Sequence, residues 1–244
     1  MQKEEYYNMY DSAEYLWWYK SLRELLGHYF RRHIAKNVSI LDAGCGTGEN
    51  MVFLQSLGYT SITGIDLSED SILLCKKRGI KNIHKGSISS LDFKDNSFDV
   101  IYSLDVLGLI PEKDRHKTIQ EFYRVLKPGG WLIMQCAALE WLRSQHDVVV
   151  SMHHRFTKKE IKRDFSSFEI QKLSYRFFVL FPLMAAIKLL KSNTKSHKAT
   201  SDVNRPSPLL NSIFLGMQRL ENILFTHLSL PIGTSLFLVA KKPL

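Results

Sequence analysis

The chain has 244 residues, of which 45% are hydrophobic and 23% are charged, and this composition excludes a disordered or fibrous protein. Its formal net charge of +9 permits an anionic partner, such as a nucleic acid or a membrane surface, without requiring one. Three scattered cysteines (Cys45, Cys75 and Cys136) have no metal-ligand spacing, so we expect neither a disulfide framework nor a bound metal.

The N-terminal residues and the longest apolar run predict the cellular compartment of the protein. Residues 1–5 are acidic, whereas a signal peptide begins with a basic segment followed by an apolar one. The longest apolar run, 177–190, is shorter than the roughly 20 residues that span a bilayer. We therefore expect a cytoplasmic protein without a transmembrane segment.

Apolar residues recur between residues 14 and 33 at the spacing of one helical face, which predicts an N-terminal amphipathic helix. Short apolar runs then alternate with helical segments, a pattern typical of a doubly wound parallel sheet. The predicted strands are 38–42, 61–66, 82–85, 98–103 and 131–136, and the predicted helices are 49–57, 68–78 and 111–126. Pro128-Gly129-Gly130 predicts a turn into the fifth strand.

The C-terminal part predicts two more strands, 168–176 and 234–240. An apolar segment (177–190), a polar loop (191–207) and an apolar helix (209–225) lie between them, and we interpret these as an insertion. The predicted fold is α/β: a Rossmann-like, seven-stranded sheet with an N-terminal helical lid and a helical insertion before the last strand. The expected parts of this single domain are the lid (1–36), the core (37–138) and a substrate-side segment (139–244) with the insertion at about 177–230.

The sequence Leu41-Asp42-Ala43-Gly44-Cys45-Gly46-Thr47-Gly48 predicts a strand that runs into a glycine-rich loop. Glycines at these positions allow a tight turn and close approach to a ligand, because glycine tolerates positive φ and has no side chain. The helix that follows offers free N–H groups to an anionic group. The spacing excludes the dinucleotide fingerprint, since Glu49 stands where its last glycine is needed, and no Gly-Lys-Ser/Thr follows as in a phosphate-binding P-loop.

This G-x-G-x-G loop, preceded by an acidic residue, resembles the first motif of the class I S-adenosylmethionine (SAM)-dependent methyltransferases. Asp66 ends the second predicted strand, where that family has an acidic residue. Residues 95–101 resemble the family's loop into the fourth strand, and residues 126–130 resemble its turn before the fifth. The resemblance covers about residues 38–136.

The resemblance implies SAM as the cofactor, S-adenosylhomocysteine as its product and no metal. It places Asp42 and Gly44 near the amino-acid end of SAM and brings Gly46 close to it. Asp66 is expected to bind the ribose hydroxyls, since a carboxylate accepts two hydrogen bonds at once. The other cofactor contacts expected are Cys45, Leu67 against the adenine, Ser87 and Ile88 at the adenine edge, and Ser103.

Two positions depart from the family's pattern. Many relatives have an acidic residue at the position of Ser87, whose hydroxyl is a weaker acceptor for the adenine amino group. Many also have Leu-Glu-His after the fourth strand, where this chain has Leu107-Gly108-Leu109. A catalytic acid–base pair expected there is missing.

Polar residues between 141 and 155 follow the fifth strand and are therefore expected near the ligand edge of the sheet. We expect His146 or His153 to act as a base, and Arg143 or Arg155 to hold an acidic substrate. The alternative is that most of them lie on the surface of a connecting helix. The expected catalytic residues are His146, His153 and Arg155, and the expected substrate contacts are Tyr6, Tyr10, Trp18, Trp141 and Arg143.

Two further segments bear on the acceptor. In the family the N-terminal segment often folds over the cofactor as a lid. Here the adjacent Trp17 and Trp18 cannot both face one core, so we expect one of them to line the pocket or to pack under the insertion. The apolar insertion is open to three interpretations: a hydrophobic lid for a lipid-like acceptor, a plain helical subdomain, or a dimer contact.

The sequence predicts a methyltransferase that acts on oxygen, as carboxylate or hydroxyl, in a small molecule, a peptide or a lipid-like natural product. Expected partners are that acceptor, a membrane surface in peripheral contact, and a second copy if the protein is a dimer. One alternative is an RNA methyltransferase, although residues 103–106 lack the Asn/Asp-Pro-Pro-aromatic motif of amino-methylating enzymes. Another is a catalytically silent SAM-binding partner protein.

Overall fold

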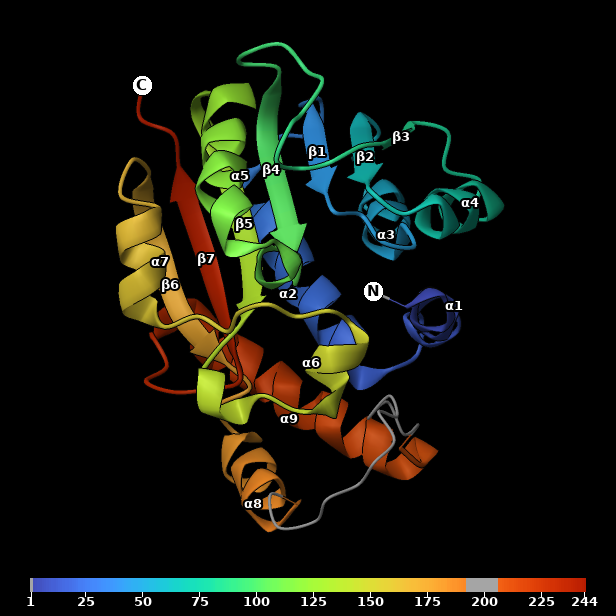
Figure 1. Cartoon of the computed structure of the whole chain (residues 1–244), viewed down its shortest axis with the longest axis vertical. Helices are drawn as coiled ribbons and strands as arrows, with labels where there is room; N and C mark the ends of the chain where they lie inside the picture. The colour runs from blue at the N-terminus through green and yellow to red at the C-terminus, as the bar shows by residue number, and fades with distance from the viewer. Residues whose placement is uncertain (1, 192–205) are drawn as a thin grey trace.

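The computed structural model describes residues 2–191 and 206–244 and is shown in Figure 1. Within these residues seven strands form one sheet in the order β3-β2-β1-β4-β5-β7-β6, as predicted in number. The strands are β1 (Ile40–Ala43), β2 (Ile62–Asp66), β3 (Ile83–Lys85), β4 (Phe98–Leu104), β5 (Leu126–Ala137), β6 (Glu169–Arg176) and β7 (Ser235–Lys241).

Helices cover both faces of the sheet. One buried cluster joins α2, α3 and α9 to one face, and another joins α5 and α7 to the other, which makes the three layers visible in Figure 1. The helices are α1 (Lys3–Ser12), α2 (Trp17–His33), α3 (Glu49–Ser56), α4 (Glu69–Lys77), α5 (Glu112–Val125), α6 (Gln145–Val149), α7 (Lys158–Asp164), α8 (Phe181–Lys191) and α9 (Pro208–His227), with single 3₁₀ turns η1 (Leu107–Leu109) and η2 (Glu140–Leu142).

The parallel arrangement predicted from the first five strands is confirmed, and the structure adds the direction of the last two, which the sequence left open. Strands β1 to β5 pair in parallel, but β7 runs antiparallel between β5 and β6. The end of β6 therefore faces the start of β7, with Arg176 opposite Ser235. The predicted insertion, now seen as α8 and α9, consequently leaves and rejoins the sheet at the edge where β1, β2, β4 and β5 end.

The N-terminal region forms two helices rather than one. Helix α2 begins at Trp17, three residues after the predicted start, and α1 precedes it. The buried guanidinium of Arg23 explains the break, because Nη1 donates to the Ala13 carbonyl at 2.6 Å and Nη2 to the Glu14 carbonyl at 3.3 Å. These carbonyls lie in the bend, where a side chain satisfies them in place of a helical N–H.

The predicted turn at residues 128–130 is instead an irregular part of one long strand, β5. Its register with β4 shifts between Phe98 and Val100. Gly129 adopts a φ of 74°, and its N–H donates to the carbonyl of Lys242. A glycine permits this conformation without strain, so the strand bends without ending.

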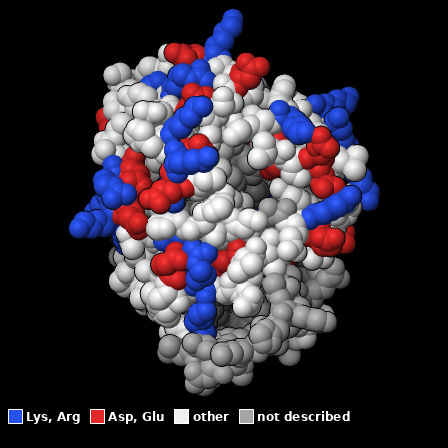
Figure 2. Space-filling view, in the orientation of Figure 1, with Lys and Arg blue, Asp and Glu red and all other residues white. Residues whose placement is uncertain are grey.

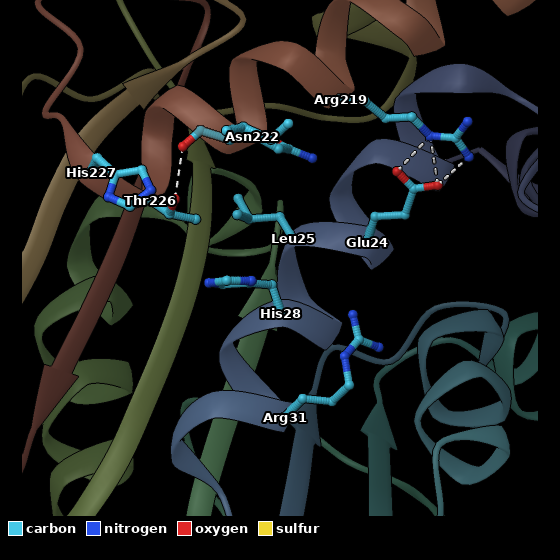
Figure 3. Close-up of a pocket in the computed structure, with 9 residues that line it drawn as sticks. Glu24, Leu25, His28, Arg31, Arg219, Asn222, Thr226 and His227 are labelled. Atoms are coloured by element: carbon cyan, nitrogen blue, oxygen red, sulfur yellow. Dashed lines mark hydrogen bonds and ion pairs between the residues drawn. The ribbon is translucent and has the colours of Figure 1, made fainter.

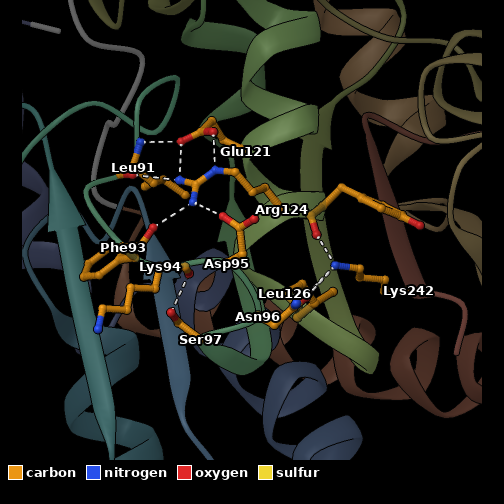
Figure 4. Close-up of polar contacts among 11 residues, drawn as sticks. Leu91, Phe93, Lys94, Asp95, Asn96, Ser97, Glu121, Arg124, Leu126 and Lys242 are labelled. Carbon is orange, nitrogen blue, oxygen red and sulfur yellow. Dashed lines mark hydrogen bonds and ion pairs between the residues drawn. The ribbon is translucent and has the colours of Figure 1, made fainter.

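The loop before β4 lies at the amino edge of the sheet and is held by one arginine (Figure 4). Arg124 of α5 donates to the carbonyls of Phe93 (2.7 Å) and Leu91 (2.8 Å) and pairs with Asp95 and Glu121. This part of the family resemblance therefore stabilises the fold and does not contact a ligand at the opposite edge.

Both tryptophans of α2 pack under the insertion. The rings of Trp18 and Phe177 are stacked with centroids 3.9 Å apart, and Trp17 meets Phe177 and Phe214 of α9 edge to face. The predicted polar loop at 191–207 lies mostly outside the described residues. Among the residues that are described, no helix is long and apolar enough to cross a membrane.

Candidate active site

The glycine-rich loop leaves β1 at the carboxyl edge of the sheet. Its three glycines have φ values of 86°, 53° and 78°, all in the left-handed region. A Cβ added to Gly44 would lie 2.4 Å from Val106, and one added to Gly46 would lie 2.8 Å from the methyl carbon of Met9. The loop therefore requires glycine both for its conformation and for the close approach of neighbouring residues.

Asp66 at the end of β2 joins this loop to α4. One carboxylate oxygen accepts the N–H of Gly46 and the other accepts the N–H of Ser68, each at 2.9 Å. A carboxylate has about four acceptor positions, so both oxygens keep capacity for further donors. Burial raises the pKa of Asp66, and the hydrogen bonds from the backbone oppose that rise.

These residues fit the nucleoside part of SAM. Asp66 retains acceptors for two ribose hydroxyls, and the side chain of Leu67 next to it is 70% exposed and free to cover an adenine ring. The side chain of Ser87 is half-buried, and its hydroxyl accepts the Ser89 N–H at 3.2 Å. Ser87 keeps its proton to donate, but it offers less acceptor strength to an adenine amino group than an acidic residue would.

Helix α1 lies over the glycine-rich loop. Met9 contacts Gly46, and Tyr6 lies close enough to Asp66 for its carboxylate, together with burial, to raise the pKa of Tyr6 to about 12. Tyr10 has a different position: its ring stacks on the guanidinium of Arg78 in the segment after α4, which also donates to the Tyr10 carbonyl at 2.9 Å. Tyr6 thus belongs to the cofactor side of the site, and Tyr10 attaches α1 to the α4 region.

Three of the expected cofactor side chains are directed into the protein. Cys45 and Ile88 are buried, and Ile88 belongs to the core on the α5 face. The hydroxyl of Ser103 donates to the Ala43 carbonyl at 2.7 Å and so joins β4 to β1. The side chains of these residues hold the site together from beneath, which leaves only their backbone atoms for a ligand.

Asp42 is also buried, where the hydroxyl of Tyr102 donates to it at 2.7 Å. Burial raises its pKa to about 8. Its carboxyl group is therefore mostly protonated at neutral pH and lies below the loop, next to the expected amino-acid end of SAM.

A polar chain that sequence reasoning missed begins directly after β4. Asp105, with a φ of 60°, accepts a hydrogen bond from the Gln135 amide at 2.8 Å, and the Gln135 carbonyl accepts one from Arg176. Burial raises the pKa of Asp105, against the effect of Gln135 and of the positive charges of Arg176, Arg155 and His146. The position of Asp105 after a β-strand at the ligand edge and its positive φ are the signals that could have identified it.

The packing around Gly108 explains why the Leu-Glu-His pattern is missing after β4. The segment after α6 crosses this residue, whose carbonyl accepts the N–H groups of His153 (2.8 Å) and His154 (3.2 Å). A Cβ at Gly108 would lie 2.4 Å from the sulfur of Met152. No side chain fits there, so the acidic group nearest the end of β4 is Asp105.

The segment 141–155 is held mainly by its own arginines. Arg155 binds both oxygens of buried Asp147 and the carbonyl of Ala138, so three of its five N–H donors are occupied. Arg143 donates to the carbonyls of Met152 and His153 and pairs with Glu140. Both arginines act in the structure as connectors of this segment.

The other expected residues of this segment differ in position. His153 is exposed, and Trp141 is 49% exposed with its ring edge-on to Phe181 of α8. His146 has a buried Nδ1 without a partner among the described residues. Of the expected catalytic residues, both Arg155 and His146 therefore lie near the carboxylate after β4, whereas His153 is exposed.

Two grooves of the described residues lie away from these side chains. One, of about 460 Å³, lies between α2 and α9, and the other, of about 940 Å³, lies at the amino edge around Arg124. Near the centre of the face in Figure 2 the surface is also hollowed, where the end of β4 faces α1. We place the candidate site there because its residues, rather than the size of a groove, carry the chemistry.

A sheet of this order, with a glycine-rich loop after β1 and a carboxylate at the end of β2, is typical of the class I SAM-dependent methyltransferases, and the chain contains a domain of this class. Residues 41–134 match a family model described as a methyltransferase domain. SAM is the methyl donor of this class.

Two curated relatives illustrate the match. Cycloartenol-C-24-methyltransferase 1 of Oryza sativa is 28% identical over 159 residues, which cover 60% of this chain and 44% of the relative. A phthiotriol/phenolphthiotriol dimycocerosates methyltransferase of Mycobacterium tuberculosis is 36% identical over 97 residues, 38% of this chain and 35% of the relative. The chain thus matches less than half the length of either relative.

Among solved structures, the [4+2]-cyclase SpnF superposes with a TM-score of 0.61 at 19% identity, covering 93% of this chain and 83% of that chain. At this identity the likeness concerns the fold alone. The name of that protein also shows that this fold serves a reaction other than methyl transfer, so activity has to be argued from the site.

Proposed function

We propose that the protein transfers the methyl group of SAM to a hydroxyl oxygen of an apolar, lipid-like acceptor. The observation that carries this proposal is Asp105, a carboxylate with a raised pKa directly after β4 at the ligand edge. A base whose pKa is raised toward neutrality is suited to accept a proton from a hydroxyl group.

In the proposed step, bound SAM supplies an electrophilic methyl group. The acceptor oxygen forms the new O–C bond as the C–S bond breaks, and the hydroxyl proton passes to the carboxylate of Asp105. Gln135 orients that carboxylate through its amide, and Arg176 orients Gln135 in turn. The guanidinium groups of Arg176 and Arg155 oppose the rise in the pKa of Asp105 that burial causes.

The apolar character of the acceptor is supported by an aromatic cluster (Trp17, Trp18, Phe177 and Phe214) next to the hydrogen-bonded series Asp105–Gln135–Arg176. The guanidinium of Arg176 lies 4.6 Å from the centre of the Phe177 ring, which stacks on Trp18. The rice and mycobacterial relatives carry the names of a sterol and of dimycocerosates, which supports a lipid-like acceptor here. Arg176 itself is fully buried and near Glu221 and Asp105, so it is a poor anchor for an anionic substrate.

The test uses methyl-labelled SAM with lipid and water-soluble extracts of the source cells. We expect label in a lipid product that withstands mild alkali, as an ether does and an ester does not. Asp105→Asn should lower the transfer rate by about 10²–10⁴-fold while SAM affinity stays nearly unchanged. The wild-type rate should fall as the pH drops through the raised pKa of Asp105, because protonation removes the base.

Asp92→Asn, at an exposed position before β4, is the matched control and should retain the wild-type rate. Label in a peptide or a water-soluble product would contradict the proposed acceptor, and an Asp105→Asn variant with full activity would contradict the proposed base. SAM binding without any labelled product would favour the catalytically silent alternative.

Charge gives the nucleic-acid alternative little support. On the face shown in Figure 2, basic and acidic side chains are interspersed and no broad patch has one sign. Nucleic-acid surfaces are commonly marked by clustered Lys and Arg.

A further inference from the structure

Helix α9 buries two polar side chains beside Phe225 and leaves a row of apolar side chains exposed. Its inward face carries Gln218 and Glu221, which are 0% and 1% exposed, whereas its outward face is a row of leucine and isoleucine side chains. These outward side chains, each between 47% and 71% exposed, are Leu209, Leu210, Ile213, Leu220, Ile223 and Leu224. A row of exposed apolar side chains on one face of a helix is typical of an interaction site.

The inward polar residues have structural partners, so the helix cannot simply rotate to bury its apolar row. Glu221 accepts the backbone N–H groups of Phe177 and Val179 after β6. Asn222 donates to the carbonyl of Ser21 in α2, and Asn211 accepts the Trp17 N–H at 2.9 Å. These contacts set the rotation of α9 and keep the apolar row outside.

A basic groove of about 460 Å³ between α2 and α9 runs beside this row and shares Ile223 with it. Figure 3 shows His28 and Arg31 on the α2 side and His227 on the α9 side. Arg219, also in the groove, pairs with Glu24, the acidic residue among those that line it. Burial, followed by the nearby positive charges of Arg32 and Arg31, lowers the pKa of His28, so the positive charge of the groove comes from Arg31 and Arg219 rather than from this histidine.

The segment of sequence around α9 also has a net positive charge. Residues 177–230 contain six Lys or Arg and two acidic residues, one of which is the buried Glu221. Two copies of the chain meeting across a two-fold axis would place one basic groove near the other, which is unfavourable. An anionic surface with an apolar interior complements both the apolar row and the basic groove.

We propose that α9 docks the protein on the surface of an anionic phospholipid membrane. The outward leucine and isoleucine side chains enter the boundary between headgroups and acyl chains, as the apolar face of an interfacial helix does. The basic groove lies at the level of the lipid phosphates. This interaction goes beyond the proposed methyl transfer, and it is measured without any methyl acceptor.

The test is co-sedimentation of the full chain with lipid vesicles. We expect strong binding to vesicles of phosphatidylcholine and phosphatidylglycerol in about equal amounts, and weak binding to phosphatidylcholine alone. Leu220→Gln combined with Ile223→Gln should lower binding to the anionic vesicles by at least about tenfold. Arg31→Gln should weaken it by a few fold and reduce its dependence on salt concentration.

Two control variants match these changes. Leu73→Gln alters a leucine of α4 that is 58% exposed outside the row, and Lys94→Gln removes an exposed positive charge before β4. Both should bind vesicles as the wild type does. Circular dichroism and SAM binding of each variant show whether it is folded, and separate a failure of docking from a failure of the cofactor site.

Absence of wild-type binding to anionic vesicles would overturn the proposal. So would equal loss of binding in the control variants. If the wild type ignores vesicles but is a dimer that Leu220→Gln with Ile223→Gln dissociates, the apolar row is a contact between two copies and not a membrane surface.

Discussion

At the scale of single residues, three carboxyl groups at the carboxyl edge differ through their hydrogen-bond partners. Asp42 accepts a hydrogen bond from the hydroxyl of Tyr102, and Asp66 accepts hydrogen bonds from two backbone N–H groups. Asp105 accepts a hydrogen bond from the side-chain amide of Gln135. These partners suit a neutral group beneath the loop, an acceptor for ribose and a proton acceptor. The proposed roles follow from the environment of each carboxyl group rather than from its residue type.

Asp66→Ala removes the proposed ribose acceptor and also the acceptor of the Gly46 N–H. We expect SAM affinity to fall by well over tenfold, which corresponds to at least about 1.4 kcal/mol. Isothermal titration calorimetry with SAM measures the change, and Asp92→Ala should leave the affinity as it is. Unchanged affinity in Asp66→Ala would show that the nucleoside is held elsewhere.

At the scale of elements, one buried carboxylate acts together with Asn211 and Asn222 to fix the position of α9. Glu221 accepts the N–H groups of Phe177 and Val179, where the chain leaves β6. Phe177 has a φ of 62°, so no regular strand or helix satisfies its N–H. The same carboxylate therefore holds the end of β6, the aromatic cluster and the rotation of α9.

Glu221→Ala should destabilise the protein by about 2–5 kcal/mol, because it leaves two N–H groups without their acceptor. Urea unfolding measures the free-energy change. Glu24→Ala breaks a partly exposed ion pair with Arg219 on the outer side of the same helix, and it should cost less than about 1 kcal/mol. A loss in Glu221→Ala no larger than in Glu24→Ala would refute the anchoring role.

At the scale of the whole molecule, stability depends on the proton bound to Asp42. Its pKa is raised to about 8 in the folded protein, whereas in the unfolded chain it has the ordinary value for an aspartate. The unfolded chain therefore binds fewer protons between about pH 4 and pH 8. The contribution of Asp42 to stability is full below that window and is lost as the pH rises through it.

The slope from this group is at most about 1.4 kcal/mol per pH unit, with stability falling as the pH rises. Asp42→Asn mimics the protonated carboxyl group and should remove this slope. The free energy of unfolding, measured by urea titration across the window for both proteins, gives the difference, in which other titrating groups cancel. Parallel pH profiles of the two proteins would show that Asp42 is ionised in the folded state.

Local patterns determined much of the fold. The apolar runs 98–103 and 234–240 predicted β4 and β7 closely, because buried strands depend on short apolar segments bounded by turn residues. The break between α1 and α2 depends instead on Arg23, whose side chain satisfies two carbonyls about ten residues away. The direction of β7 was also beyond the sequence pattern, which is the same for either orientation of a buried strand.

The sequence by itself determined the glycine-rich loop, the position of Asp66 after β2 and the class of the domain, because these depend on residue types at short spacings. Only the tertiary structure joined the side chains of Asp105, Gln135 and Arg176 by hydrogen bonds, since these residues come from three different strands or strand ends. It also showed that Arg155 is occupied by Asp147 and that α9 exposes its apolar face. Long-range contacts decide which polar side chains remain available to a ligand, and no local pattern encodes them.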